Sequence, residues 1–372
     1  MSARRVLVLS TAAGGGHVRA AEAVEKAIAR EDPGAQLLRL DALDFMPKAL
    51  RELHAGAYLR MVDRSPELWG YLYAATERGS SRPAERLKRA IDRFSARKLL
   101  VAVDEFAPDD VVATHFLPAN AVAASRRKKR PRVHVVVTDY DAHAFWIVRN
   151  ASRYCVATEP MRFDLARRGV DRERIAVTGI PIDPVFESPP ARVDARRSLG
   201  LDDSGPVVLV LAGGFGVGDV EAAVRSALLS HPSATVLAVA GRNAGLERRL
   251  RDLEAPAGRR LLAFGFVHGI ERLMAAADVL VTKAGGLTVS EALACGLPIV
   301  VTSPIPGQED RNADFLLEAG AAILSKDAGL LECRLPDLLS DGKRLARMAA
   351  AARSAARPDA AARVARAVLA AP

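Results

Sequence analysis

The sequence contains few cysteines and no long apolar segment. Its three cysteines, Cys155, Cys295 and Cys333, are far apart and form no CxxC pair, which excludes a disulfide framework and argues against a zinc site. This cysteine usage indicates a reducing compartment. No run of apolar residues approaches the roughly 18 that a membrane-spanning helix requires. We therefore expect an intracellular protein without transmembrane helices.

At 372 residues the chain is long enough for two domains, and half of its residues are hydrophobic. A short apolar run at residues 6–9 is followed at once by a glycine-rich loop, which favours a first strand over a secretory signal. The net charge of +9 is uneven: residues 1–186 hold 31 Lys and Arg against 23 Asp and Glu, whereas the remainder holds 22 against 21. The first half is therefore expected to face something anionic.

Strand patterns alternate with helical patterns, which predicts an α/β protein with doubly wound parallel sheets. The predicted strands are residues 4–10, 36–40, 110–113, 133–137, 153–157 and 175–177 in the first half, and 207–212, 235–240, 261–264, 279–281 and 298–301 in the second. Because each half begins with a strand, a glycine loop and a helix, we expect two Rossmann-like domains facing a cleft. Their predicted bounds are 1–178 and 207–355, with a proline-rich linker at 179–206 and a helix at 356–372 that packs back on the first domain.

Residues 44–98 interrupt this alternation. They carry the aromatic residues Tyr58, Trp69, Tyr71 and Tyr73, besides two phenylalanines, among many basic ones. From residue 83 to residue 100 the apolar positions leave a basic face, which is typical of a segment lying on an anionic membrane. A solvated helix face in an arginine-rich protein is the alternative.

The segment from Lys283 to Asn312 carries the most specific pattern. Gly285 and Gly286 follow an apolar strand, and Thr288 is expected to be the N-cap of the next helix, with Glu291 completing a capping box. A glycine turn that opens a helix presents backbone N–H groups suited to a phosphate. Glu291 is then placed to accept hydrogen bonds from a sugar diol. This segment predicts a nucleotide-sugar site.

The sequence Gly14-Gly15-Gly16-His17 lies between a strand and a helix predicted over residues 18–29. It fits neither the P-loop nor the GxGxxG pattern. Three consecutive glycines favour a close backbone approach to a ligand over a plain turn with a capping histidine. The helix dipole is expected to lower the pKa of His17, leaving a neutral base for a sugar-acceptor hydroxyl.

Weaker patterns follow other strands. Gly213, Gly214 and Phe215 predict a diphosphate contact or a plain tight turn, and the backbone at Phe266 and Val267 is placed for a uracil edge.

Asp139 and Asp141 form a DxD pattern after the strand at 133–137, but a metal site is the weaker interpretation. Asp139 and His143 are expected to contact the acceptor or to assist the base. His115 is a further candidate for contact with the acceptor, and a structural role is the alternative. The basic run at 126–130 favours an exposed turn over a nucleic-acid site.

With these motifs the chain resembles the family of monogalactosyldiacylglycerol synthases and processive diacylglycerol glucosyltransferases, of glycosyltransferase family 28. It is more distantly similar to the N-acetylglucosaminyltransferase that makes lipid II. The resemblance rests on GGGH, on THFLPA around His115, on TDYDAHAFW at 138–146, on GFVHGIERLMAAAD at 265–278, and on KAGGLTVSEALACGLPIV with PIPGQEDRNA. It implies the two-domain GT-B fold, an inverting transfer and no bound metal or other cofactor. Asp141 and Ala144 depart from the family pattern, which leaves the acceptor open.

The motifs and the resemblance together predict three sets of site residues. The catalytic pair is His17 as the base and Asp139 as its helper. The predicted acceptor-binding residues are Gly15, Gly16, His115, His143 and Trp146. The predicted donor-binding residues are Gly213, Gly214, Phe215, Gly241, Phe266, Val267, Gly285, Gly286, Leu287, Thr288, Glu291, Gln308 and Glu309.

The function predicted from these residues is transfer of a hexose from a UDP-sugar to the hydroxyl of a membrane lipid, diacylglycerol first among them. The expected partners are a UDP-hexose, a lipid acceptor and an anionic membrane surface, without nucleic acid, at the cytoplasmic face of the membrane. The alternatives are transfer of N-acetylglucosamine to another lipid-linked acceptor, a sugar-nucleotide epimerase on the same fold, and a polyanion-binding protein without enzymatic activity.

Overall fold

The computed structural model describes residues 3–12, 15–47, 96–125, 130–201, 205–213 and 219–370. Two compact units account for the chain. The first comprises Met1–Pro184, Pro306–Gln308 and Asp359–Pro372, and the second comprises Val185–Ile305 and Glu309–Pro358. Most of the insertion at 44–98 and of the basic run at 126–130 lies outside the described residues.

The first unit is built on a parallel sheet with the strand order β2-β1-β3-β4-β5-β6. Its strands are β1 (Arg5–Ser10), β2 (Gln36–Asp41), β3 (Asp110–Ala113), β4 (Arg132–Val136), β5 (Arg153–Val156) and β6 (Ile175–Val177). Its helices are α1 (Gly15–Glu31), α5 (Arg97–Phe106), α6 (Phe116–Ala123), α7 (Glu159–Arg167) and α16 (Ala360–Leu369), with 3-10 turns η1 (Ala42–Phe45), η2 (Ala144–Trp146) and η3 (Arg172–Arg174). The chain leaves β1 toward the β2 edge and later passes from β3 toward β4, so right-handed crossovers place α1 and α6 on opposite faces.

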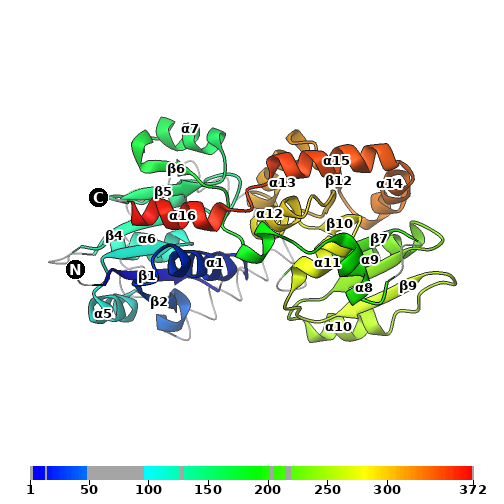
Figure 1. Cartoon of the computed structure of the whole chain (residues 1–372), viewed down its shortest axis with the longest axis horizontal. Helices are drawn as coiled ribbons and strands as arrows, with labels where there is room; N and C mark the ends of the chain where they lie inside the picture. Colours follow the sequence, from blue (N-terminus) through cyan, green and yellow to red (C-terminus); the bar gives the residue numbers. More distant parts are fainter. Residues whose placement is uncertain are drawn as a thin grey trace. The chain divides into compact units, whose positions relative to one another are not determined.

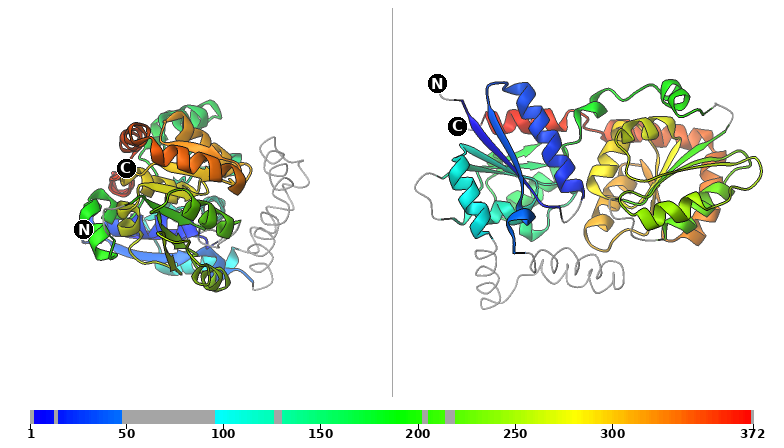
Figure 2. Two further views of the ribbon diagram at one scale, coloured as in Figure 1. Left: turned by 90° about the vertical axis from the view of Figure 1, so that its right-hand side faces the viewer. Right: turned by 90° about the horizontal axis from the view of Figure 1, so that it is seen from below.

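Helices α1 and α16 lie side by side on one face of this sheet, although they come from opposite ends of the chain (Figures 1 and 2). Val24 and Ile28 of α1 and Val364 of α16 are fully buried in one apolar core. Sheet residues such as Val112 complete that core. The alternation of apolar residues at helical spacing in both segments explains this packing.

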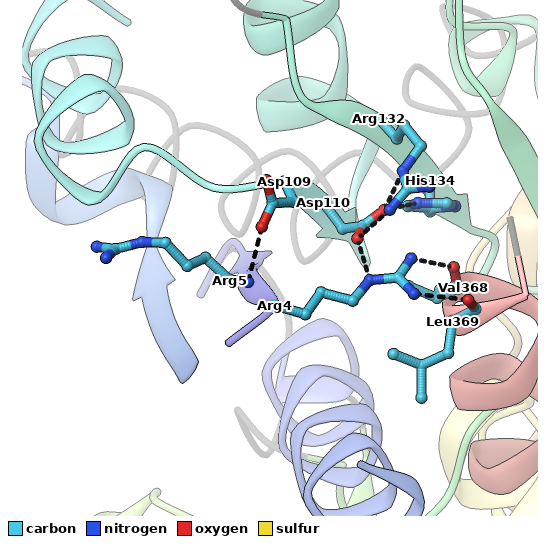
Figure 3. Close-up of polar contacts among 8 residues, drawn as sticks. All are labelled: Arg4, Arg5, Asp109, Asp110, Arg132, His134, Val368 and Leu369. Carbon is cyan, nitrogen blue, oxygen red and sulfur yellow. Dashed lines mark hydrogen bonds and ion pairs between the residues drawn. The ribbon is translucent and has the colours of Figure 1, made fainter. Parts of the chain in front are cut away.

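The buried carboxylate of Asp110, at the end of the sheet where the strands begin, is linked to the last residues of α16 through Arg4 (Figure 3). Asp110 accepts hydrogen bonds from Arg4 Nε at 2.7 Å, from Arg132 Nε at 2.9 Å and from His134 Nε2 at 2.8 Å. Arg4 also donates to the carbonyls of Val368 and Leu369, at the end of α16. Burial alone would raise the pKa of Asp110, but these donors hold it at about 2.

The second unit repeats the plan with the strand order β12-β11-β10-β7-β8-β9. Its strands are β7 (Val207–Leu211), β8 (Thr235–Val239), β9 (Arg260–Phe264), β10 (Val279–Thr282), β11 (Ile299–Thr302) and β12 (Ala322–Ser325). Its helices are α8 (Arg192–Ser198), α9 (Val220–Leu229), α10 (Ala244–Arg251), α11 (Ile270–Ala276), α12 (Gly286–Ala294), α13 (Gln308–Glu318), α14 (Ala328–Ser340) and α15 (Gly342–Ala355). Apolar residues of β7, β8 and β10 pack against α9, α10 and α14 in its core.

The predicted fold class, two doubly wound α/β sheets, is confirmed. The predicted strands occur with ends displaced by at most one residue, whereas β12 was not predicted. Helix α1 begins at Gly15, earlier than the predicted residue 18, because two of the glycines continue into the helix. Among the described helices, none is long and apolar enough to cross a membrane.

Candidate active site

The predicted site residues follow the carboxyl ends of strands, and several of them lie where a sheet reverses its order. In the first sheet β1 and β3 are neighbours, and the chain leaves them in opposite directions. In the second sheet β7 and β10 have the same relation. Loops that diverge from two such strands leave a crevice, which is where ligands bind to open α/β sheets. The beginning of α1 and the residues after β3 follow strands at one such point, and the beginning of α12 follows a strand at the other.

His17 is held at the first of these points by two threonines. Its ring nitrogen Nδ1 lies 2.9 Å from the carbonyl oxygen of Thr114 and 2.9 Å from the hydroxyl oxygen of Thr138. The Thr114 hydroxyl in turn donates to the His17 carbonyl at 2.8 Å. Because a carbonyl oxygen only accepts, we assign the proton of the neutral ring to Nδ1. The other nitrogen, Nε2, then carries a lone pair and can accept a proton.

The pKa of His17 is lowered to about 4, mainly because burial disfavours the charged ring, while the hydrogen bond to Thr114 acts in the opposite direction. The predicted direction of this shift is confirmed, but burial takes the place of the helix dipole as its main cause. The neutral ring therefore predominates at pH 7.

Aromatic rings surround His17 and form what we call the aromatic cluster, defined as His17, His115, Phe116, His143, Phe145 and Trp146. His115 meets His17 edge to face, with ring centroids 4.6 Å apart, and stacks on Phe116 at 4.2 Å. The indole of Trp146 lies 6.3 Å from the His17 ring and 6.1 Å from the His115 ring. The structure thus brings two of the predicted acceptor-binding side chains, His115 and Trp146, next to the predicted base.

Two histidines of this cluster begin helices. His115 is the N-cap of α6 and accepts a hydrogen bond from the N–H of Leu117 through Nδ1 at 3.1 Å. His143 is the N-cap of η2 and accepts from the N–H of Phe145 through Nδ1 at 3.2 Å. Each neutral ring therefore carries its proton on Nε2. A capping role and a ligand contact are compatible for both residues.

Phe116 and Phe145 were not predicted from the sequence. Their rings lie 5.2 Å apart and are both partly exposed. Asn120 joins their two elements by donating to the carbonyl of Phe116 at 2.9 Å and to that of Phe145 at 3.3 Å. Their positions directly after His115 and before Trp146 are the only signal that the sequence offers.

Two further residues stand at strand ends in the first unit. Thr11 follows β1, is 1% exposed, and has a hydroxyl without a hydrogen-bond partner in the described structure. Asp139 is buried directly after Thr138, beyond the end of β4. The described residues include no group of three or more His, Cys, Asp or Glu side chains that could hold a metal ion.

The donor segment forms the loop between β10 and α12 in the second unit. Helix α12 begins at Gly286 with Gly285 as its N-cap, so the prediction that Thr288 is the N-cap is wrong. Thr288 instead lies inside the first turn. The first N–H groups of a helix have no partner within it, and here they belong to Gly286, Leu287 and Thr288. A Cβ added at Gly285 would meet no other atom within 4 Å, so the backbone is open to a ligand on that side.

Asn312 supports this loop and was not predicted. Its side chain is fully buried and donates to the carbonyl of Ala284 at 2.9 Å. Glu309, one helical turn earlier, accepts from the N–H of Ile305 at 2.7 Å and so closes the loop before α13, which begins at Gln308. Glu291 is 1% exposed within α12. The roles of Gln308, Glu309 and Glu291 toward a sugar nucleotide stay predictions.

The remaining predicted donor residues lie after β7, β8 and β9. Gly213 and Gly241 have φ angles of +72° and +64°, a region that disfavours any other residue. Phe266 is 50% exposed, with the Arg242 guanidinium 5.0 Å from its ring centre. Val267 follows it and is partly exposed. Gly214 and Phe215 lie outside the described residues.

Residues 17–182 match the family model of monogalactosyldiacylglycerol synthase, and residues 207–364 match the C-terminal domain of glycosyltransferase family 28. The processive diacylglycerol beta-glucosyltransferase of Bacillus mycoides (strain KBAB4) is 30% identical over 98% of this chain and 93% of its own length. The chain belongs to the glycosyltransferase family that contains the monogalactosyldiacylglycerol synthases and the processive diacylglycerol glucosyltransferases. It is accordingly a glycosyltransferase, as predicted.

Solved structures agree on the fold. The structure of Acinetobacter baumannii MurG has a TM-score of 0.64 at 18% identity and covers 99% of both chains. That of the UDP-GlcNAc 2-epimerase of Neisseria meningitidis has a TM-score of 0.59 at 12% identity, with 98% of this chain and 99% of that one covered. The predicted GT-B fold is thereby confirmed, and this fold is shared by transferases and by an epimerase.

Proposed function

We propose that this glycosyltransferase moves a hexose from a UDP-sugar to the hydroxyl of a membrane lipid, with diacylglycerol as the acceptor. The observation that carries the proposal is His17, whose Nδ1 is occupied by Thr114 and Thr138 and whose Nε2 is left with a lone pair. The resemblance to a diacylglycerol glucosyltransferase over nearly the whole chain supports the acceptor class.

In the proposed reaction Nε2 of His17 takes the proton of the acceptor hydroxyl. The hydroxyl oxygen then forms its bond to the anomeric carbon as the bond from that carbon to the β-phosphate oxygen breaks, and UDP leaves. A single displacement of this kind inverts the anomeric configuration. A base that is neutral at pH 7 is required for the first step, and the low pKa of His17 meets that requirement.

The leaving diphosphate needs stabilisation as its charge develops. The first-turn N–H groups of α12 and the dipole of that helix are suited to this task, so the proposal includes no metal ion or other cofactor. Glu291 is proposed to hold the ribose, and Gln308 and Glu309 the sugar hydroxyls.

The aromatic cluster is proposed to receive the acceptor. Phe116 and Phe145 offer partly exposed apolar rings near His115, which suits the carbon skeleton of a glycerolipid beside its hydroxyl. His115 and His143, which begin α6 and η2, are proposed to contact its ester or hydroxyl oxygens. The excess of basic residues in the first half supports a peripheral position on an anionic membrane, at its cytoplasmic face.

The test uses the full-length protein with labelled UDP-glucose, UDP-galactose or UDP-N-acetylglucosamine and vesicles of diacylglycerol and phosphatidylglycerol. We expect label in the lipid fraction with one hexose donor. The His17→Ala variant is expected to lose about 100-fold or more of this rate, as removal of a general base does, while UDP binding measured by calorimetry is retained.

The matched control is His231→Ala. His231 caps a turn just before the first residues of β8, at the end of the second sheet opposite the donor loops, and is expected to be dispensable. Absence of lipid labelling with all three donors would contradict the proposal, and so would conversion of the sugar nucleotide into its epimer without acceptor. Transfer of N-acetylglucosamine alone would overturn the choice of hexose.

A further inference from the structure

We propose that Thr138 is a positioning residue, whose hydroxyl holds the His17 ring in the orientation in which Nε2 faces the acceptor. This inference rests on the proposed role of His17. The residue comes from a different strand end than Thr114, and no sequence pattern connects it with His17.

Whether Nδ1 carries a hydrogen determines whether the Thr138 hydroxyl donates or accepts in this contact. Nδ1 lies 2.9 Å from both the Thr114 carbonyl oxygen and the Thr138 hydroxyl oxygen. If Nδ1 were unprotonated, two lone pairs would face each other across the contact to the carbonyl. Nδ1 therefore carries the hydrogen, and both oxygens share it in a three-centre hydrogen bond. The Thr138 hydroxyl is an acceptor here.

Two acceptors restrict the ring more than one does. With the Thr114 carbonyl alone, the imidazole could swing about its Cβ–Cγ bond while keeping a single bent hydrogen bond. A second acceptor at the same distance leaves one ring orientation that serves both. Reversal of the ring would place a carbon between the two oxygens and leave a buried hydroxyl without its partner, because Thr138 is only 3% exposed.

The sheet order explains why these three residues meet. Thr114 follows β3, Thr138 lies beyond the end of its neighbour β4, and His17 is in the first turn of α1, which follows β1. The ring thus lies across the carboxyl ends of three adjacent strands. Thr114 additionally binds the His17 backbone, since its hydroxyl donates to the His17 carbonyl at 2.8 Å. The His17 backbone is therefore held by the Thr114 hydroxyl, whereas its ring is held by the Thr114 carbonyl together with the Thr138 hydroxyl.

Both acceptors of the Nδ1 proton are uncharged. A carboxylate in the place of Thr138 would stabilise the imidazolium and raise the basicity of the ring, whereas a hydroxyl orients it with a smaller effect on charge. Thr138 therefore acts on geometry. The consequence is that its loss should reduce the rate of the chemical step and leave the binding of UDP-sugar unchanged.

The test compares Thr138→Val, which keeps the shape and removes the hydroxyl, with Thr138→Ser, which keeps the hydroxyl. Lipid glycosylation by the full-length protein is measured at varied donor concentration. We expect Thr138→Val to lower kcat about 10- to 100-fold, because loss of a hydrogen bond and misplacement of a base each reduce a rate by amounts of this order. The KM for UDP-sugar should stay within about 2-fold of the wild-type value, and Thr138→Ser should retain most of kcat.

Thr178→Val is the matched control. Thr178 is also a buried threonine just beyond a strand of the same sheet, at the end of β6, but its hydroxyl donates to the carbonyl of Gly179 at 2.9 Å. Its loss removes buried hydrogen bonds, to Gly179 and to Cys155, without touching His17. We expect this variant to keep kcat. Equal losses in the Thr138→Val and Thr178→Val variants would show that only packing was disturbed, and would overturn the inference.

A second readout does not depend on turnover. Nitrogen-15 NMR of histidine-labelled protein distinguishes a protonated from an unprotonated ring nitrogen, and the signals of His17 are assigned from their loss in His17→Gln. We expect the Nδ1–H form in the wild type and averaged, broadened signals in Thr138→Val. An unchanged His17 spectrum together with wild-type kcat in Thr138→Val would refute the positioning role.

These outcomes separate the inference from the proposed function. If His17→Ala keeps full activity, the base assignment fails and the role of Thr138 fails with it. If His17→Ala is inactive and Thr138→Val is unaffected, the inference alone fails.

Discussion

Lowering the pH tests the environment of His17 directly. As the proposed base, His17 must be neutral, and its pKa of about 4 means that it stays neutral well below the ordinary histidine value of 6.5. At pH 5 about nine-tenths of His17 is then neutral, compared with about three parts in a hundred for a histidine of unperturbed pKa. The structure therefore predicts that kcat/KM changes little between pH 8 and pH 5, whereas an ordinary histidine base would lose roughly 30-fold.

The same shift lowers stability as the pH falls. Below pH 6.5 the unfolded chain binds a proton at His17 that the folded protein does not bind, so stability decreases as the pH falls from 6.5 toward 4. At pH 5 this term amounts to about 2 kcal/mol relative to pH 8. The pKa of the buried His134 is also lowered by burial and contributes in the same direction. The comparison with His17→Gln isolates the part that belongs to His17.

The assay is initial-rate transfer to lipid vesicles from pH 8 to pH 5, with urea unfolding of the wild type and of His17→Gln at each pH. The ring of His115 lies against that of His17, with centroids 4.6 Å apart, so a His115→Gln variant is measured in parallel to separate the contribution of His115 from that of His17. A rate that falls with an apparent pKa near 6.5, or equal pH dependence of stability in the wild type and His17→Gln, would refute the reasoning.

Three further predictions follow from single residues. Replacement of Glu291 by alanine should raise the KM for UDP-sugar about 10-fold or more, because the proposed ligand of the ribose is lost, and steady-state kinetics with varied donor will check it. Asp110→Asn should lower the free energy of unfolding by about 3 kcal/mol at pH 7; the pKa of about 2 implies that this difference shrinks as the pH falls from 4 toward 2, which urea unfolding will measure. Thr11→Val should raise the free energy of unfolding by about 1 kcal/mol, since it removes a buried hydroxyl without a partner in the described structure; a destabilised variant would contradict this.

The strands and the glycine turns were predictable because their signals are local. Runs such as Val207–Leu211 are bounded by turn residues, and an all-parallel sheet buried on both faces requires such runs to be continuously apolar. The donor loop was predictable for the same reason, as Gly285 and Gly286 stand between a strand and a helix. The start of α12 was predicted three residues late because a threonine is the more usual N-cap, whereas here Gly285 takes that position.

The contacts around the base depended on tertiary structure. His17 is separated by 97 residues from Thr114 and by 121 from Thr138, and only the strand order β1-β3-β4 brings the three together. Asn312 meets Ala284 across 28 residues for a similar reason, through the adjacency of β10 and β11. A sequence pattern reports what neighbouring residues can form, whereas the pairing of strands decides which distant side chains share a hydrogen bond. The sequence alone thus determined the fold class, the family and the identity of the candidate base, and the tertiary structure decided which nitrogen of that base is available to accept a proton.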